Sequence, residues 1–125
     1  MRVKIVDANV VLRYLLADVA TLFTQSEQIL ENEAVYLPFE VLAEVVYVLD
    51  KVYAVSRGEI SASLSGLLKY PTVSTYNVEV AIGGLDTYSN SSLDIVDSLL
   101  CGYRSVQGAE VVSFDKQLNK RLGTP

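Results

Sequence analysis

The chain has 125 residues, 50% of them hydrophobic, and this length fits one compact domain, 1–125, with a single core. The absence of histidine excludes histidine-based catalysis and histidine-ligated zinc, and the single cysteine excludes an internal disulfide framework. The net charge of −5 argues against general coating of nucleic acid, and every apolar run is shorter than the roughly 18 residues of a membrane span. Without a visible signal peptide, and with one cysteine suited to a reducing compartment, we expect a cytoplasmic protein with no membrane segment.

Short apolar runs alternate with longer segments of helical period, which is typical of an α/β domain with a mainly parallel sheet. In chain order, we predict a strand at Arg2–Val6, helices at Val10–Leu16 and Thr21–Glu31, a strand at Ala34–Leu37, a helix at Phe39–Lys51, a helix from a capping box at Ser56 to Lys69, a strand at Val73–Thr75, helices at Asn77–Tyr88 and Ser91–Gln107, a strand at Glu110–Phe114 and a short helix from Asp115 to Leu122.

Four acids, Asp7, Glu44, Asp97 and Asp115, stand out because folding alone explains them poorly. Asp7 and Asp115 each follow a predicted strand directly, and ligands of open parallel sheets bind beyond the carboxyl ends of strands. Glu44 and Asp97 lie at the rims of apolar helix faces, roughly 40° outside the nearest buried position. Carboxylates brought together raise one another's pKa, and a hard cation such as Mg²⁺ removes that cost. The pattern therefore predicts a metal site built from these four carboxylates.

Each acid also has a simpler interpretation. Asp7 and Asp115 can cap the helices that follow them, although Asn9 is better placed to cap the first helix. Glu44 can belong to a solvated flank that also holds Lys51.

Two neighbouring acids compete for the same roles. Asp94 lies farther than Asp97 from the apolar face of its helix and suits the positive helix N-terminus, and Glu40 lies farther out than Glu44. We therefore favour Asp97 and Glu44 as ligands.

Four segments resemble, in order, the motifs of a PIN domain, most closely that of the VapC-type toxins: residues 5–16, 37–49, 93–100 and 113–118. The acidic positions of these motifs fall on Asp7, Glu44, Asp97 and Asp115. The resemblance implies a three-layer α/β/α sandwich around a four- or five-stranded, mainly parallel sheet. It also implies a metal-dependent endoribonuclease, the toxin of a toxin–antitoxin pair, that forms a homodimer and is neutralised by a cognate antitoxin protein.

On this resemblance, Mg²⁺ or Mn²⁺ assists hydrolysis of an RNA phosphodiester. Asp7, Asp97 and Asp115 would bind the metal directly, and Glu44 directly or through water. Supporting roles in orienting waters or holding the RNA backbone fall to Asn9, Ser113, Arg13 and Lys116. One or two metals, and transfer, ribosomal or messenger RNA or single-stranded DNA as substrate, all stay open.

Two other enzyme classes fit less well. A phosphatase of the haloacid dehalogenase type needs a second acid two residues after Asp7, where this chain has Asn9. A response-regulator receiver needs an acceptor aspartate after the third strand, where this chain has Tyr76 and Asn77. The main alternative is a catalytically inactive PIN-fold protein that binds RNA or a partner. The mean hydropathy of +0.30 also allows an apolar surface that serves mostly an obligate interface.

Overall fold

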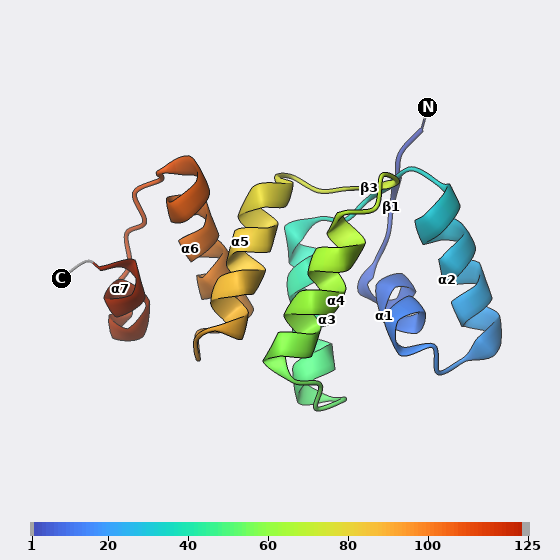
Figure 1. Ribbon diagram of the computed structural model, residues 1–125, viewed down its shortest axis with the longest axis horizontal. Helices are drawn as coiled ribbons and strands as arrows, with labels where there is room; N and C mark the ends of the chain where they lie inside the picture. The colour runs from blue at the N-terminus through green and yellow to red at the C-terminus, as the bar shows by residue number, and fades with distance from the viewer. Residues whose placement is uncertain (1, 124–125) are drawn as a thin grey trace.

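The computed structural model describes residues 2–123, in which helices dominate and a small sheet lies among them (Figure 1). The elements are β1 (Lys4–Ile5), α1 (Ala8–Leu16), α2 (Ala20–Asn32), β2 (Val35–Tyr36), α3 (Phe39–Lys51), α4 (Arg57–Leu68), β3 (Val73–Ser74), α5 (Val78–Ser89), α6 (Ile95–Gln107) and α7 (Lys116–Leu122). Within this range, no helix is long and apolar enough to cross a bilayer.

The sheet consists of three short parallel strands in the order β1-β2-β3. Lys4 is level with Val35, which in turn is level with Val73. The ladder extends slightly beyond the strands, since the Leu37 N–H donates to the carbonyl of Ser74 at 2.8 Å. The α/β class predicted from the sequence is therefore confirmed, with less strand than the apolar runs suggested.

The predicted strand at Glu110–Phe114 is wrong for this chain as folded. In the described part of the chain the sheet has three strands, not four or five, and the connection between α6 and α7 joins none of them. The apolar run has the composition of a strand, but a strand forms only where a neighbouring backbone accepts its hydrogen bonds. A complete three-layer sandwich stays a prediction.

The predicted helices are confirmed, with two shifted starts. The helix predicted from Val10 begins at Ala8. The helix expected from Ser91 begins at Ile95, because Asp94 is its N-cap and accepts a hydrogen bond from the N–H of Asp97 at 2.8 Å. Ser91 instead donates from its hydroxyl to the carbonyl of Thr87 and belongs to the turn before α6. The helix therefore begins after Asp94 and not after Ser91 or Ser92, although serine and aspartate are equally acceptable caps by residue type.

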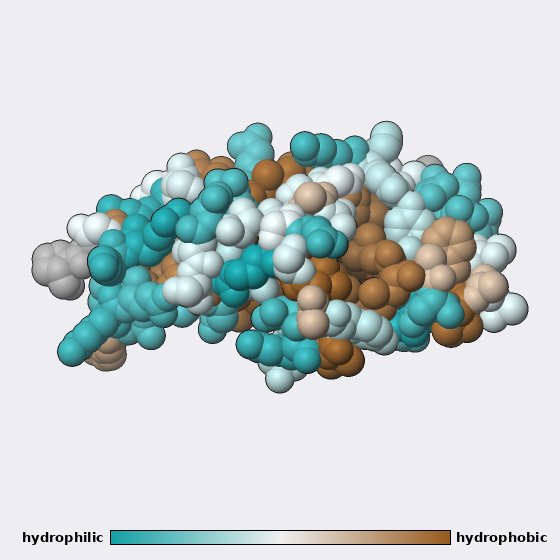
Figure 2. All heavy atoms as spheres, turned by 60° about the horizontal axis from the view of Figure 1, so that its bottom comes forward, coloured by the Kyte–Doolittle hydropathy of each residue, from teal (hydrophilic) through white to brown (hydrophobic). Residues whose placement is uncertain are grey.

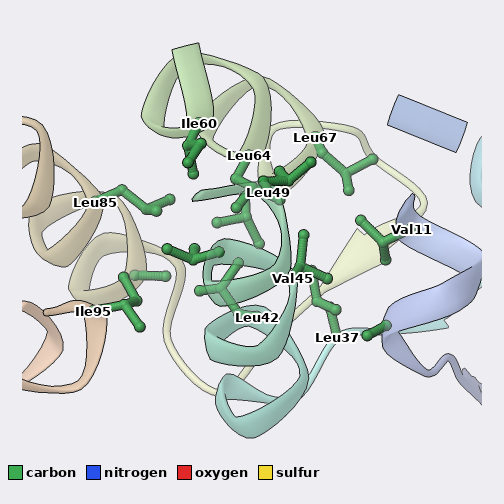
Figure 3. Close-up of a cluster of buried hydrophobic side chains, with 14 of the residues drawn as sticks. Val11, Leu37, Leu42, Val45, Leu49, Ile60, Leu64, Leu67, Leu85 and Ile95 are labelled. Atoms are coloured by element: carbon green, nitrogen blue, oxygen red, sulfur yellow. The ribbon is translucent and has the colours of Figure 1, made fainter. Parts of the chain in front are cut away.

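The main core surrounds α3, whose buried side chains recur at helical spacing (Figure 3). Leu42, Val45 and Leu49 are buried on this face and meet side chains from α1, α4, α5 and α6. Val11 of α1 also belongs to this cluster. The helix that begins after Asp7 therefore packs against the same core as the helix that carries Glu44. Burial of each such side chain contributes about 1.5–3 kcal/mol.

A second, smaller cluster holds α7 against α6. Leu118 and Leu122 of α7 pack with Leu93 and Cys101, and Val111 of the connection is packed against the edge of this cluster. Figure 1 shows α7 at one end of the molecule, with α5 and α6 between it and the rest of the fold. α7 is therefore anchored on α6 and not on the sheet, whereas α6 also contributes Ile95 and Leu99 to the main core.

Candidate functional site

Asp7 is the N-cap of α1. Its Oδ1 accepts a hydrogen bond from the Val10 N–H at 3.2 Å, and its backbone is extended, as a cap requires. The expectation that Asn9 would cap this helix is wrong, because the helix begins one residue before Asn9, at Ala8. The Asp7 side chain is nevertheless exposed, and its second oxygen stays available to a ligand.

Asp97 lies one turn inside α6, close to two further acids. Its pKa is raised, first by burial and then by the negative charges of Asp94 and Asp115. Asp115 is the N-cap of α7, where its Oδ1 accepts from the Leu118 N–H at 2.7 Å. The packing of α7 on α6 thus brings two predicted ligands, Asp97 and Asp115, into one neighbourhood, with Asp94 beside them.

Glu44 is exposed on α3, outside the buried stripe of that helix. The flanking Lys51 forms its ion pair with Asp50 at 3.5 Å. Glu44 therefore lies on the solvated flank that also holds Lys51, without an ion pair to it, and it is a carboxylate near the helix that Asp7 caps, since α1 packs on α3.

The four acids do not converge within one chain. Within residues 2–123, no group of three or more acidic or cysteine side chains is close enough to hold a metal ion. Figure 1 shows why: α1, capped by Asp7, and α7, capped by Asp115, lie on opposite sides of α3, α4, α5 and α6. The oxygen donors suit Mg²⁺ or Mn²⁺ chemically, but their positions do not assemble the set. Asp7 lies at the α1 end, and Asp97 and Asp115 lie at the α6–α7 end, whereas α3, which carries Glu44, contacts both α1 and α6. The site is thus divided between these two ends.

The four supporting residues have different environments. Arg13 donates to Asp18 Oδ2 at 2.8 Å and to the Tyr53 hydroxyl at 3.3 Å, so its guanidinium is engaged in holding the fold. Ser113 Oγ accepts from the Asp115 N–H at 2.9 Å and thereby holds the N-cap residue of α7. Asn9 and Lys116 are exposed. Of these four, Arg13 is the one whose side chain forms an ion pair within the described residues.

Sequence reasoning missed a basic pocket between α6 and α7. A hollow of about 300 Å³ is lined by Arg104 of α6 and Arg121 of α7, and a neighbouring hollow by Lys120 and Arg121. Figure 2 shows this end of the molecule as mostly hydrophilic, whereas apolar atoms are exposed nearer α1 and α3. The spacing of the basic residues was visible in the sequence, but their pairing across two helices depends on the docking of α7.

Cys101 also lines the first hollow, and its side chain is buried. Burial raises the pKa of this thiol, and the positive charge of Arg121 opposes the shift only in part. A protonated, buried thiol is a poor nucleophile and a poor metal ligand.

Comparison with known proteins gives one match that spans nearly the whole chain. The sequence profile of the PIN domain matches residues 4–121, a range that contains all four acids and both parts of the divided site. No curated protein and no solved structure matches this chain. PIN domains are generally nucleases that use divalent metals. Because the profile covers far more than half of its length, the chain belongs to the PIN domain family.

Proposed function

We propose that this protein is a metal-dependent endoribonuclease, the VapC-type toxin of a toxin–antitoxin pair. The observation that carries the proposal is the extent of the PIN match, whose range, 4–121, contains Asp7, Glu44, Asp97 and Asp115. The exposure of Asp7 and Glu44 and the closeness of Asp97 to Asp115 support it, because all four carboxylates stay accessible to a ligand.

The side chains of this protein limit the mechanisms by which it can cleave RNA. Without histidine, the protein lacks the usual general base, and its one thiol is buried and protonated. A bound Mg²⁺ or Mn²⁺ would supply an acidified water and neutralise charge on the phosphodiester. The contribution of the protein is then to present carboxylate oxygens at fixed positions, which the N-caps of α1 and α7 achieve for Asp7 and Asp115.

The basic pocket gives the RNA backbone a place to bind. Arg104 and Arg121 face a shared hollow, and Lys120 extends the positive charge along α7. Arginine binds phosphate through two parallel hydrogen bonds, so a pair of arginines suits a phosphodiester chain. The overall charge of −5 is thus compatible with a nuclease, because a local cationic surface lies on the same two helices as Asp97 and Asp115.

Matched carboxylate variants test the proposal. We expect Asp97→Asn to lower Mn²⁺-dependent RNA cleavage by about 100-fold or more, because an amide is a poor hard-metal ligand. Asp94→Asn is its control, since asparagine caps a helix as well as aspartate does. Glu44→Gln and its control Glu40→Gln, one turn earlier on α3, form a second pair. Calorimetric Mn²⁺ titration of all four variants separates lost metal binding from lost folding.

The outcomes discriminate between the two function classes. Loss of cleavage and of Mn²⁺ binding in Asp97→Asn and Glu44→Gln, with both controls active, supports the nuclease. Wild-type protein that binds RNA without cutting it, whatever metal is added, would favour the inactive binding protein instead.

The toxin role needs a separate measurement. Induction of the chain should halt growth of a bacterial host, and Asp7→Asn should relieve that arrest. The protein should also co-purify with the product of an adjacent reading frame. Continued growth despite cleavage-competent protein would contradict the toxin role while leaving the nuclease assignment in place.

A further inference from the structure

A small hollow lies where α3, α4 and α5 meet the start of α6, and we call it the α3–α6 hollow. It measures about 160 Å³, and its lining includes Tyr47, Asp50, Arg57, Tyr88 and Ile95. Figure 3 shows Ile95 among the side chains that fill the space between α6 and α3. Clefts for drug-sized ligands measure ~300–1,000 Å³, so a hollow of this size suits a single planar ring.

One wall of the α3–α6 hollow carries a buried hydroxyl. Tyr88 is 2% exposed, and its hydroxyl has no partner at hydrogen-bonding distance within the described residues. Burial raises the pKa of Tyr88; Arg57 opposes this shift, whereas Asp50 lies near enough to add to it. Buried polar groups are almost always paired, because an unpaired one has lost its hydrogen bonds to water. A ligand in the hollow can supply the missing partner.

Arg57 holds Tyr88 in place. Its guanidinium lies over the Tyr88 ring, 3.8 Å from the centroid, and its Nε donates to the Tyr88 carbonyl at 2.9 Å. A second hydrogen bond runs from Nη2 to the carbonyl of Leu93, in the turn before α6. The ring is therefore fixed from two sides, and its hydroxyl is preorganised beside Asp50 before any ligand binds.

Asp50 is the carboxylate of the α3–α6 hollow that can accept hydrogen bonds from a ligand. Its side chain is 30% exposed, and its contact with Lys51 at 3.5 Å is an ion pair near the surface, which water and a ligand can replace at little cost. Asp94 also borders the hollow, but its Oδ1 accepts from the Asp97 N–H and caps α6. The hollow thus combines one hydroxyl donor with one available carboxylate.

A hydroxyl donor beside a carboxylate is complementary to one base of RNA. The pairing edge of guanine presents, in order, the acceptor O6 and the donors N1–H and N2–H. Tyr88 can donate to O6, and the two oxygens of Asp50 can accept from N1–H and N2–H. The pairing edges of adenine, cytosine and uracil do not offer donors on two neighbouring atoms. The α3–α6 hollow therefore favours guanine.

The α3–α6 hollow lies beside two of the predicted metal ligands. Tyr47 and Glu44 are neighbours on the surface of α3, because they are three residues apart. Ile95 comes two residues before Asp97 on α6. Tyr47 is 62% exposed, and an exposed tyrosine ring at the mouth of a hollow is a surface on which an unpaired base can stack.

We propose that the α3–α6 hollow binds an unpaired guanine base of the RNA substrate, with Tyr47 stacked on the ring and with Tyr88 and Asp50 bonded to its pairing edge. Because α3 and α6 also carry Glu44 and Asp97, the bound base selects which phosphodiester reaches the acids, and cleavage falls next to a guanosine. As a statement about the substrate, this inference rests on the proposed function; the guanine site itself does not.

Binding measured in chelator tests the guanine site without any cleavage. The probes are short labelled oligouridylates with a single central guanosine, inosine or adenosine, and fluorescence anisotropy gives their affinities. Inosine lacks only the N2 amino group, whereas adenosine lacks both neighbouring donors. We expect the guanosine probe to bind about tenfold more tightly than the adenosine probe, with inosine between them. Equal affinity for the three probes, or no binding at all, would overturn the proposal.

Variants assign the preference to named side chains. Asp50→Asn should remove it, because an amide offers one acceptor oxygen instead of two, and Tyr88→Phe should reduce it, because O6 loses its donor. Tyr47→Ala should weaken all three probes alike, since stacking hardly distinguishes bases. Glu79→Gln removes an exposed charge at the other end of α5 and should keep the preference. A preference for guanosine that survives Asp50→Asn would overturn the assignment.

Free guanosine monophosphate separates a nucleotide ligand from a base within RNA. We expect it to compete with the guanosine probe only weakly, because it lacks the rest of the RNA backbone. Tight, Asp50-dependent binding of the mononucleotide, together with no preference among the RNA probes, would overturn the proposal.

Cleavage mapping then links the guanine site to the acids. With Mn²⁺ and an unpaired RNA that contains all four bases, wild-type protein should cut next to guanosine. Asp50→Asn should cut without that preference, with KM raised on guanosine-containing RNA and kcat largely kept. Cleavage by wild type with no preference for guanosine would overturn the proposal and leave the nuclease in place. A protein that prefers guanosine in binding but cuts no RNA would refute the proposed function and leave the guanine site in place.

Discussion

Two helix glycines that look alike in the sequence have opposite surroundings: Gly102 lies where α6 packs against α5, and Gly66 lies inside α4 beside open space. A Cβ added at Gly102 of α6 would lie 2.5 Å from the carbonyl oxygen of Val80 and 3.0 Å from the backbone N of Gly84. Both atoms belong to the backbone of α5 and cannot rotate away. A Cβ at Gly66, inside α4, meets nothing within 4 Å. We therefore predict that Gly102→Ala destabilises the fold and that Gly66→Ala stabilises it.

The magnitudes follow from two terms. Replacing glycine with alanine inside a helix gains about 0.8–1.0 kcal/mol of helix propensity, and both variants share this gain. Forcing extra atoms into a packed contact typically costs 1–3 kcal/mol, and only Gly102→Ala incurs this cost. The difference in unfolding free energy between the variants should then be about 1–3 kcal/mol, and it isolates the packing cost because the propensity gain cancels.

Urea unfolding at neutral pH, followed by far-ultraviolet circular dichroism, measures this difference. Gly102→Ala should also weaken Mn²⁺ binding. α6 carries Asp97 and must shift away from α5 to make room for the added methyl group. Equal stabilisation by Gly102→Ala and Gly66→Ala would refute the close approach of α5 and α6, and with it the position given to Asp97.

Two further predictions concern pH. Burial, followed by hydrogen bonds that include one to Glu31, raises the pKa of Tyr14 far above its ordinary value. The folded state holds this proton more tightly, so the stabilisation is complete below about pH 10 and is lost as pH rises further. Urea titrations from about pH 9 to about pH 11 should show a smaller loss of unfolding free energy for Tyr14→Phe than for wild type. Burial, then the charges of Asp94 and Asp115, raises the pKa of Asp97, so ionisation of Asp97 costs stability above its folded-state pKa. In chelator, Asp97→Asn should exceed wild type in stability at neutral pH, with the gain vanishing as pH falls to about 4; an equal gain at both pH values would contradict this cause.

The helices were largely predictable from the sequence because their signals are local. The apolar spacing of Leu42, Val45 and Leu49 predicts the buried face of α3, and the hydroxyl of Ser56 caps α4 as its capping box indicates. Helical hydrogen bonds join residues four apart, so the residues that decide a helix lie within it. The errors are local too: Asp7 replaced Asn9 as a cap, and Asp94 replaced the serines before it.

The candidate acids were also selected from sequence, whereas their division into two parts was not. Asp7 and Asp115 each follow an apolar run, and both runs have the composition of strands. Composition does not identify the partner of a strand, because backbone hydrogen bonds are alike in every sheet. Only the tertiary structure shows that 110–114 pairs with none of the strands in this chain.

The sequence by itself determined the helices, the α/β class, the accessible carboxylates and the exclusion of histidine chemistry, since each depends on residue type and short spacing. The tertiary structure alone decided the three-stranded sheet, the open edge of β1, the close contact at Gly102 and the docking of α7 beside Asp97. These features join residues far apart in the chain, and their free energy depends on which surfaces meet. The separation of Asp7 from Asp115 is such a feature, because it depends on where α7 docks.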